Sequence, residues 1–336
     1  MKFCHTFQCA IKPQQDGLTL TEALTQRFPY LQREEWRGLI AAGTVLVNGS
    51  PALPDLILNS GDRLLTRIDG HEEPSADTEI RTIYADEDFL LVEKPAGMPV
   101  SRTGRIIHHT LINILRRQQQ NPEIQLMHRL DRETGGLLLC ARNRKTCKQW
   151  QQHLPEILTR KFYLAMVRGR LEVNNYLIQL PLAEQNHSAI RCQMHVDPGG
   201  KTATTTLHTI AANAECSLIL AELHSGRKHQ LRAHLAHLGH PLFGDKIYSY
   251  DGHYFLTRLE RELTDTDYAE LGALHHTLHA WAVALQLPGH APSFFFSSRF
   301  SKDMKQYLHH FPNWREKAEQ GLMSLGVREE LLVQQR

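Results

Sequence analysis

Hydrophobic residues recur at helical spacing in two neighbouring segments near the start of the chain. In residues 18–31, LTLTEALTQRFPYL, the apolar positions fall on one helical face, at Leu20, Ala23, Leu24, Phe28 and Leu31. The segment REEWRGLIAAG repeats this spacing and ends on Gly43, a residue type that often follows the last turn of a helix. The spacing predicts two short amphipathic helices.

The period of the pattern then changes to two, which is typical of a β-strand. Val45 and Val47 alternate with residues of the other face up to Asn48-Gly49, a dipeptide that favours a tight turn. GDRLLTRI, residues 61–68, predicts a further short strand. The polar run DGHEEPSADTE that follows has no apolar period and is typical of a linker. We therefore expect a small α+β domain over residues 1–70 and a linker over residues 71–79.

The middle of the chain, residues 80–300, mixes strand-like and helix-like segments without a regular alternation. EIRTIYADEDFLLVEKPAG contains two strand-like runs around an acidic turn, and KFYLAMV and SLILAEL are rich in residues that favour strands. This mixture predicts an α+β domain with a mixed, mostly antiparallel sheet. Residues 301–336 are helical in pattern and polar, so we expect a peripheral helical extension there.

The length and composition fit this division into two domains. The 336 residues exceed the roughly 150 that organise around one core. With 41% hydrophobic and 22% charged residues, the composition is that of a globular protein and excludes a disordered or fibrous chain. No apolar stretch approaches the ~18 residues of a membrane span, and the first residues lack the pattern of a secretory signal. We therefore expect a cytoplasmic protein.

The net charge of +2 conceals two segments of opposite sign. The segment from His128 to Arg170 contains ten Lys and Arg residues and three carboxylates, which gives a local charge of +7. Between Asp251 and Glu270, six carboxylates face two arginines. A basic segment on a near-neutral protein is expected of a nucleic-acid-binding face. The alternative is a chance cluster on a solvated surface.

The cysteines and histidines give no clear metal pattern. The six cysteines form no CxxC pair, so reduced thiols are expected. Four of the 21 histidines crowd one short segment, at His229, His234, His237 and His240. That segment lacks the adjacent acid of an HExxH zinc motif. We expect hydrogen-bonded or surface histidines, no metal and no cofactor, and keep a metal-dependent hydrolase as an alternative.

The run LMHRLDRETGGLLLCAR, residues 126–142, carries the most informative chemistry. Asp131 lies among His128, Arg129 and Arg132 and is followed by Gly135-Gly136 and an apolar strand. The glycines permit a tight turn and the strand anchors it, so the carboxylate is held rigidly. Flanking cations favour its ionised form, which suits a nucleophile or a base. The alternative is a structural Asp–Arg salt bridge at a turn.

HRLDRETGG resembles the HRLDxxTSG signature of the RluA family of RNA pseudouridine synthases, with Gly135 where serine is usual. Further blocks resemble the family in the same order, over about 210 residues: EDFLLVEKPAGMPV, RKFYLAMVRG, SGRKHQLRAHLAHLGHPLFGDKIY and LHA. The resemblance implies a catalytic domain of the pseudouridine synthase type over residues 80–300. It also implies an enzyme that isomerises uridine in RNA without a cofactor.

The resemblance implies a role for three residues. It places the catalytic carboxylate at Asp131, an active-site tyrosine at Tyr163 and the arginine that pairs with the carboxylate at Arg232. Asp131 can add to the sugar or the base, or abstract a ribose proton, and these alternatives stay open. Tyr163 can stack on uracil or accept the carbon-five proton, although an ordinary core tyrosine is the alternative. GHPLFGD is expected to frame the pocket as a loop.

The expected partner is RNA. Enzymes that act on a base within folded RNA extrude the nucleotide and depend on backbone contacts. The cations beside the motif residues are candidates for these contacts: Arg129, Arg132, Arg227 and Lys228. A solvated surface is the alternative for each of them.

The N-terminal domain resembles the S-four-like RNA-binding module. The run IxxGxVxVNG of that module stands here as Ile40, Gly43, Val45, Val47, Asn48 and Gly49. Its usual Ser-Arg is replaced by Gln32-Arg33, followed by two glutamates. A helix-hairpin unit without a binding role is the alternative. The combination implies a monomeric enzyme for large-subunit ribosomal RNA. Transfer RNA as the substrate, or a non-catalytic RNA-binding or ribosome-assembly factor, are the alternatives.

Overall fold

The computed structural model describes residues 2–28, 31–73, 77–103, 106–185 and 188–333. The chain divides into two compact units. The first comprises Met1–Ala76 and Ser101–Ile114, and the second comprises Asp77–Val100 and Leu115–Arg336. The second unit contains every residue for which a site role is predicted above.

The first unit is a small α+β unit with a four-stranded sheet in the order β1-β4-β2-β3. The two predicted helices are α1 (Leu20–Arg27) and α2 (Arg33–Ala41). The strands are β1 (Lys2–Ala10), β2 (Val45–Val47), β3 (Ser50–Pro51) and β4 (Arg63–Glu72). A short 3-10 helix, η1 (Pro13–Gln15), follows β1.

The helices of the first unit cover a core of large apolar residues. Leu20, Leu24 and Trp36 are fully buried in it together with Val45. Strand β4 is longer than its sequence predicts, because it continues to Glu72 by pairing with β1. The predicted linker at residues 71–79 is therefore wrong in its first two residues. Polar composition was misleading there, since backbone pairing does not need apolar side chains.

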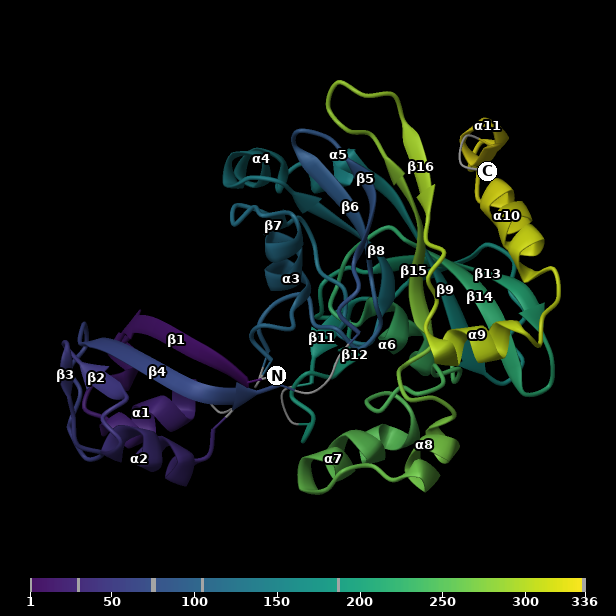
Figure 1. Ribbon diagram of the computed structural model, residues 1–336. Coiled ribbons are helices and arrows are strands. Elements are labelled where there is room, and N and C mark those ends of the chain that lie inside the picture. Colours follow the sequence, from purple (N-terminus) through teal and green to yellow (C-terminus); the bar gives the residue numbers. More distant parts are fainter. Residues whose placement is uncertain (1, 29–30, 74–76, 104–105, 186–187, 334–336) are drawn as a thin grey trace. The chain divides into compact units, whose positions relative to one another are not determined.

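The second unit is built on a ten-stranded sheet. Its main path has the order β10-β13-β14-β9-β15-β8-β6-β5, with β16 beside β15 and β7 beside β8 (Figure 1). The strands are β5 (Arg81–Ala85), β6 (Phe89–Lys94), β7 (Gln125–Leu126), β8 (Gly135–Ala141), β9 (Leu158–Arg168), β10 (Tyr176–Gln179), β13 (Thr204–Ala212), β14 (Cys216–Leu223), β15 (Leu278–Leu285) and β16 (Ser293–Phe296). A separate pair consists of β11 (Leu182–Glu184) and β12 (Met194–Val196).

Helices α3–α11 and one further 3-10 helix complete the chain. They are α3 (Leu111–Gln118), α4 (Arg144–Trp150), α5 (Leu154–Ile157), α6 (Gln230–His237), η2 (Tyr250–Gly252), α7 (His253–Glu260), α8 (Asp265–Leu271), α9 (Lys302–Leu308), α10 (Trp314–Ser324) and α11 (Glu329–Val333). Among the strands described, only β8 and β15 pair in parallel, so the predicted mixed, mostly antiparallel α+β class is confirmed. In the same part of the chain, no helix is long and apolar enough to cross a membrane.

The close approach of β8 and β15 depends on a glycine. Gly136 has φ of +108° and lies opposite Ala280. A Cβ atom at this position would collide with the Ala280 backbone. Glycine is therefore required both by the backbone conformation and by the lack of space. This contact fixes the start of β8, directly after the HRLDRET segment, against the centre of the sheet.

The C-terminal helices are part of the core, so the predicted peripheral extension is wrong. Helices α9 and α10, yellow in Figure 1, lie beside the sheet, and α10 contacts β13. Their apolar residues join those of β9 and β14 in one buried cluster: Met304, Leu308, Phe311, Ala318 and Leu322. The segment is polar on average, but its few apolar residues recur on one helical face and that face is covered.

Two adjacent residues of α10 test this packing. Leu322 is fully buried and Met323 is 40% exposed. We expect Leu322→Ala to lower the free energy of unfolding by about 2–5 kcal/mol, since it leaves a cavity in the main core. Met323→Ala, the matched control, is expected to change it by less than about 0.5 kcal/mol. Chemical denaturation measures both, and equal effects would contradict the packing of α10.

Candidate active site

Asp131 lies in a tight turn between β7 and β8. The backbone N–H of Thr134 donates to the Asp131 carbonyl oxygen at 3.2 Å, and β8 begins at the next residue, Gly135. The turn presents the Asp131 side chain beside the sheet with 28% of its surface exposed. The carboxylate is thus fixed by its backbone and still accessible to a ligand.

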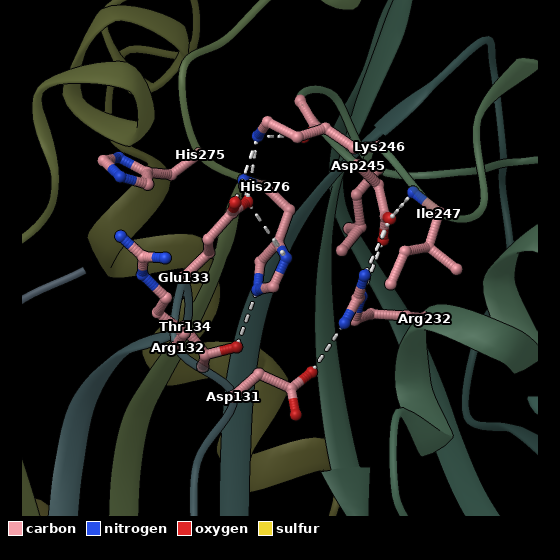
Figure 2. Close-up of polar contacts among 12 residues, drawn as sticks. Asp131, Arg132, Glu133, Thr134, Arg232, Asp245, Lys246, Ile247, His275 and His276 are labelled. Atoms are coloured by element: carbon pink, nitrogen blue, oxygen red, sulfur yellow. Dashed lines mark hydrogen bonds and ion pairs between the residues drawn. The ribbon is translucent and has the colours of Figure 1, made fainter. Parts of the chain in front are cut away.

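Arg232, the second predicted site residue, contacts Asp131 directly. It lies on α6, 101 residues further along the chain, and only 5% of it is exposed. Its Nη1 donates to Asp131 Oδ2 at 2.9 Å (Figure 2). The predicted contact of these two residues is therefore present in the structure.

Asp245 holds Arg232 from the other side. Arg232 donates through Nε and Nη2 to the two Asp245 carboxylate oxygens at 2.7 and 2.8 Å. Asp245 is fully buried and also accepts from the backbone N–H groups of Ile247 and Tyr248. A planar guanidinium held by a bidentate carboxylate has little freedom. Nη1 is therefore directed at Asp131 before any substrate binds.

The charges of this cluster decide which groups are ionised. Burial opposes ionisation of Asp131, but the neighbouring cations, Arg232 foremost, outweigh it and its pKa lies below the ordinary value. For Asp245, burial is likewise outweighed by Arg232, and its pKa is strongly lowered. One buried cation thus keeps two carboxylates charged at neutral pH.

Glu133, two residues after Asp131, and Lys246, directly after Asp245, form a second ion pair. Lys246 Nζ donates to both carboxylate oxygens of Glu133, at 3.1 and 3.2 Å. The same ammonium donates to the Leu274 carbonyl oxygen at 2.7 Å, and Glu133 accepts from the His276 backbone N–H. The loop around Asp245 and Lys246 therefore anchors the Asp131 turn at two points, as Figure 2 shows.

A buried ammonium supports the turn from below. Lys94, 1% exposed, donates to the carbonyl oxygens of Pro95, Met98 and Arg132 at 2.8–3.0 Å. Burial lowers its pKa to about 7. Because one of its acceptors follows Asp131 directly, Lys94 fixes the backbone that carries the carboxylate.

Tyr163 lies on β9 with 8% of its surface exposed. Its neighbours on the adjacent strands are Ala221 of β14 and Ala280 of β15, two small side chains on the same face. Burial, and then the charge of Asp131, raise its pKa above the ordinary value. The phenol is therefore held in its neutral form, which can stack on a base.

The four predicted RNA-binding residues have different surroundings. Arg129 and Arg132 are exposed on the Asp131 turn, and Arg132 donates through Nε to the Gly97 carbonyl oxygen at 2.9 Å. Arg227 donates to the Thr202 carbonyl oxygen at 2.8 Å, and Lys228 forms a 3.0 Å ion pair with Glu184. The first two cations lie in the site turn, whereas the second two hold neighbouring loops.

The crowded histidines have hydrogen-bond partners rather than one another. His229 bonds to Tyr248, His234 to Thr205, and His240 to the Arg168 carbonyl oxygen. His229 Nε2 lies 3.9 Å from Asp131, and burial lowers its pKa to about 4, so it is neutral at pH 7. Within the residues that the structure describes, no three His, Cys, Asp or Glu side chains are grouped as metal ligands.

The sequence reasoning missed Asp245, Lys246, Glu133 and Lys94 as parts of the site. The GHPLFGD loop was expected only to frame the pocket, yet its Asp245 holds Arg232. A usable signal existed, since Asp245 and Lys246 are two adjacent charges inside the apolar run PLFGDKIY. Charged residues in such a run are expected to be buried and paired.

Removal of the Asp245 charge tests this arrangement. At neutral pH we expect Asp245→Asn to lower the free energy of unfolding by about 3–5 kcal/mol, since Arg232 stays buried with one partner fewer. The folded-state pKa of Asp245 is lowered, so this stabilisation is lost as the pH falls from about 4 downwards. The difference from the unsubstituted protein should shrink accordingly in acid denaturation series.

A surface ion pair provides the control for Asp245. Glu172 pairs with Arg170 at 2.8 Å with both side chains about 60% exposed. Glu172→Gln is expected to leave the unfolding curve unchanged at every pH, because water screens such pairs. A pH-independent loss in the Asp245 variant would contradict the assigned charge state.

Comparison with known proteins identifies the family. A family model described as RNA pseudouridylate synthase matches residues 88–237, which include Asp131, Tyr163 and Arg232. The chain is 32% identical over 252 residues to an uncharacterized RNA pseudouridine synthase, YhcT, of Bacillus subtilis, with 71% of this chain and 81% of that protein covered.

The names of two further relatives specify a class of RNA. The ribosomal large subunit pseudouridine synthase D of Nitrosomonas europaea is 28% identical over 90% of this chain and 87% of its own length. The mitochondrial tRNA pseudouridine(32) synthase of Saccharomyces cerevisiae is 29% identical over 73% of this chain and 54% of its own length. The chain spans about half the length of the first curated relatives. It covers 44% of the human pseudouridylate synthase RPUSD2 and 54% of an uncharacterized protein of Caenorhabditis elegans.

A solved structure agrees in fold. The human RNA pseudouridylate synthase domain containing 1 has a TM-score of 0.51 and 22% identity, with 71% of this chain and 97% of that chain covered. This likeness shows the fold of the α+β unit. The identity to the Bacillus protein, with the match of the family model to residues 88–237, shows that the chain belongs to the family of RNA pseudouridine synthases.

Proposed function

We propose that this protein isomerises specific uridines to pseudouridine in structured RNA. The observation that carries the proposal is the ionised, accessible carboxylate of Asp131, held by Arg232 within the residues that match the family. Each of the mechanisms that remain open for pseudouridine formation uses one such carboxylate at the target nucleotide.

The reaction breaks the N1–C1′ bond of uridine and forms a C5–C1′ bond, while a proton leaves C5 and N1 gains one. Arg232 occupies Oδ2 of Asp131, whereas Oδ1 has no hydrogen-bond partner among the described residues. Oδ1 is therefore the oxygen that reaches the nucleotide. Addition to the sugar, addition to the base and abstraction of a ribose proton all use this same oxygen and remain alternatives.

Tyr163 supports the flipped base in this proposal. Its paired neighbours on the adjacent strands are two alanines, whose small side chains would not obstruct a planar ligand beside the ring. An aromatic ring stacks on any base and compensates part of the stacking that is lost on extrusion from the RNA. The protonated phenol can additionally donate a hydrogen bond.

The proposed substrate is large-subunit ribosomal RNA. The relative named for that RNA aligns with 90% of this chain, and the relative named for transfer RNA aligns with 73%. The longer alignment includes much of the N-terminal unit, for which an S-four-like RNA-binding role is proposed on the Ile40–Gly49 run. Transfer RNA is the second candidate. The non-catalytic factor is disfavoured, because Asp131 and Arg232 are held in a reactive geometry.

Asp131→Asn tests both the activity and the substrate. We expect cells with this allele, like cells without the gene, to lack one or more pseudouridines of large-subunit ribosomal RNA that wild-type cells contain. Site-resolved pseudouridine mapping of ribosomal and transfer RNA measures this. The asparagine is close in size, so the purified variant should fold and still bind RNA. Loss from transfer RNA alone would correct the substrate, and unchanged maps would refute the activity.

Two substitutions of Tyr163 separate stacking from proton transfer. If the ring acts by stacking, Tyr163→Phe keeps the single-turnover rate within about tenfold, whereas Tyr163→Leu lowers it by about a hundredfold or more, as expected for the loss of one base–aromatic stack of about 1–3 kcal/mol and its positioning. Release of tritium from C5-labelled RNA measures the rate. An equally inactive Phe variant would show that the hydroxyl takes part in the reaction.

A further inference from the structure

We propose that Arg258 of α7 and Arg132 of the Asp131 turn together bind one phosphate of the RNA backbone beside the target uridine. The inference rests on the proposed function for the identity of the ligand. Arg258 belongs to the segment 251–270, whose sequence is acidic overall and predicts no RNA contact. Its place in the structure gives this arginine a different role from that of the segment.

Backbone and side-chain contacts connect α7 to the turn that carries Asp131. The Phe255 backbone N–H donates to the Lys246 carbonyl oxygen at 3.1 Å, and Lys246 Nζ forms the ion pair with Glu133. Glu133 directly follows Arg132. The first turn of α7 is therefore connected to the Arg132 backbone through Lys246 and its ion pair with Glu133.

Helix α8 adds a second contact on the same side. The Tyr268 ring lies 5.9 Å from Lys246 Nζ. Thus Lys246 is held by α7 through its carbonyl group and approached by α8 through its ammonium group. The two helices are consequently fixed beside the site turn rather than projecting from it.

The Arg258 side chain has a defined position and, within the part of the chain that the structure describes, no ion pair. Its guanidinium lies 5.2 Å from the centre of the Phe255 ring, on the helix that contacts Lys246. Arg132 is held through Nε by the Gly97 carbonyl oxygen, which leaves its two terminal amino groups available. Burial lowers the pKa of Arg132. Glu133 opposes this shift and Arg258 adds to it, in agreement with two guanidinium groups near one another.

Arg132 and Arg258 each carry a positive charge that no ion pair among the described residues neutralises. Asp131 and Glu133 flank Arg132 in sequence, but Asp131 is paired with Arg232 and Glu133 with Lys246. Across residues 77–103, 106–185 and 188–333, no carboxylate lies within 4 Å of Arg132 or Arg258. Guanidinium groups bind phosphate through paired N–H donors, and one phosphate between two of them relieves their repulsion.

The position of the pair specifies which phosphate it binds. Arg132 follows Asp131, so a phosphate held by Arg132 belongs to the target nucleotide or to its immediate neighbour. Such a contact positions the RNA without reading its sequence. A free phosphate ion has the same chemistry, but only an RNA chain places the phosphate and a uridine at Asp131 together.

The same segment offers a matched control. Arg261 lies three residues after Arg258 and is also exposed, but it donates to both carboxylate oxygens of Asp267 at 2.6 and 3.2 Å. Its charge is thus neutralised within the protein. Arg258 and Arg261 differ in whether a counter-ion is present, which is the property that the proposal uses.

The test measures RNA binding over a range of salt concentrations. All proteins carry Asp131→Asn, so that no turnover occurs, and the probe is an in vitro transcript of large-subunit ribosomal RNA. We expect Arg258→Gln to weaken binding by several-fold to about tenfold at low salt and to reduce the slope of log K against log salt by about 0.7–0.9, the loss of one phosphate contact. Arg261→Gln should change neither quantity.

Further variants separate a shared phosphate from a folding effect. Arg258→Lys should keep the slope, because the charge remains. Combined Arg132→Gln and Arg258→Gln should reduce the slope no more than the larger single change, since both residues contact the same phosphate. Full additivity, or an unchanged slope in Arg258→Gln with an unchanged melting temperature, would overturn the proposal. So would an Arg258→Lys variant that behaves like Arg258→Gln.

Failure of the proposed function would give a different result. If wild-type protein formed no pseudouridine in any RNA but the Arg258→Gln slope still fell, the phosphate site would stand and the activity would not. If pseudouridine formed normally and the slope did not change, the activity would stand and the phosphate site would not. The two ideas are therefore tested independently.

Discussion

The active site depends on one buried guanidinium, that of Arg232, placed between two carboxylates. A guanidinium with 5% exposure has lost nearly all its water, and such a charge is tolerated only with close partners. Asp245 supplies two hydrogen bonds and Asp131 supplies the third. Since Asp245 is fully buried and Asp131 is partly open, the pair divides into an anchoring carboxylate and an accessible one. The ionised, accessible state of Asp131 is thus a consequence of how Arg232 is buried.

This constraint explains why the loop after α6 is needed as well as the motif turn. Asp245 and Lys246 are adjacent, and their side chains reach Arg232 and Glu133 respectively. Two ion pairs therefore hold α6 and the Asp131 turn to one loop. Lys94 and the Gly136 contact fix the same turn to β6 and β15. The carboxylate is oriented by several elements distant in sequence, so a local change in any of them is expected to reach Asp131.

Sequence patterns predicted the parts of this protein that have a local signature. The helices around Leu24 and Trp36 followed from periodicity, and the mostly antiparallel sheet followed from segments rich in strand-favouring residues. The HRLD run directed attention to Asp131, and the HQLR block directed attention to Arg232. Strand β1, the extension of β4 to Glu72 and the burial of α10 have no such signature. They depend on partners remote in sequence, which periodicity within one segment does not register. The pairing of Asp245 with Arg232 is likewise a tertiary contact, and only its unusual charge in an apolar run pointed to it.

Tertiary contacts also decide which charges are paired, and this matters for RNA binding. A count of residues marks 128–170 as basic and 251–270 as acidic, yet the count does not say which charges are free. Lys228 is basic by sequence but pairs with Glu184, whereas Arg258 lies in the acidic segment and has no carboxylate within 4 Å among the described residues. A polyanion responds to charge that is both uncompensated and close to its path. By that criterion the cations of the site turn and Arg258 matter more to RNA than the larger number of paired ones.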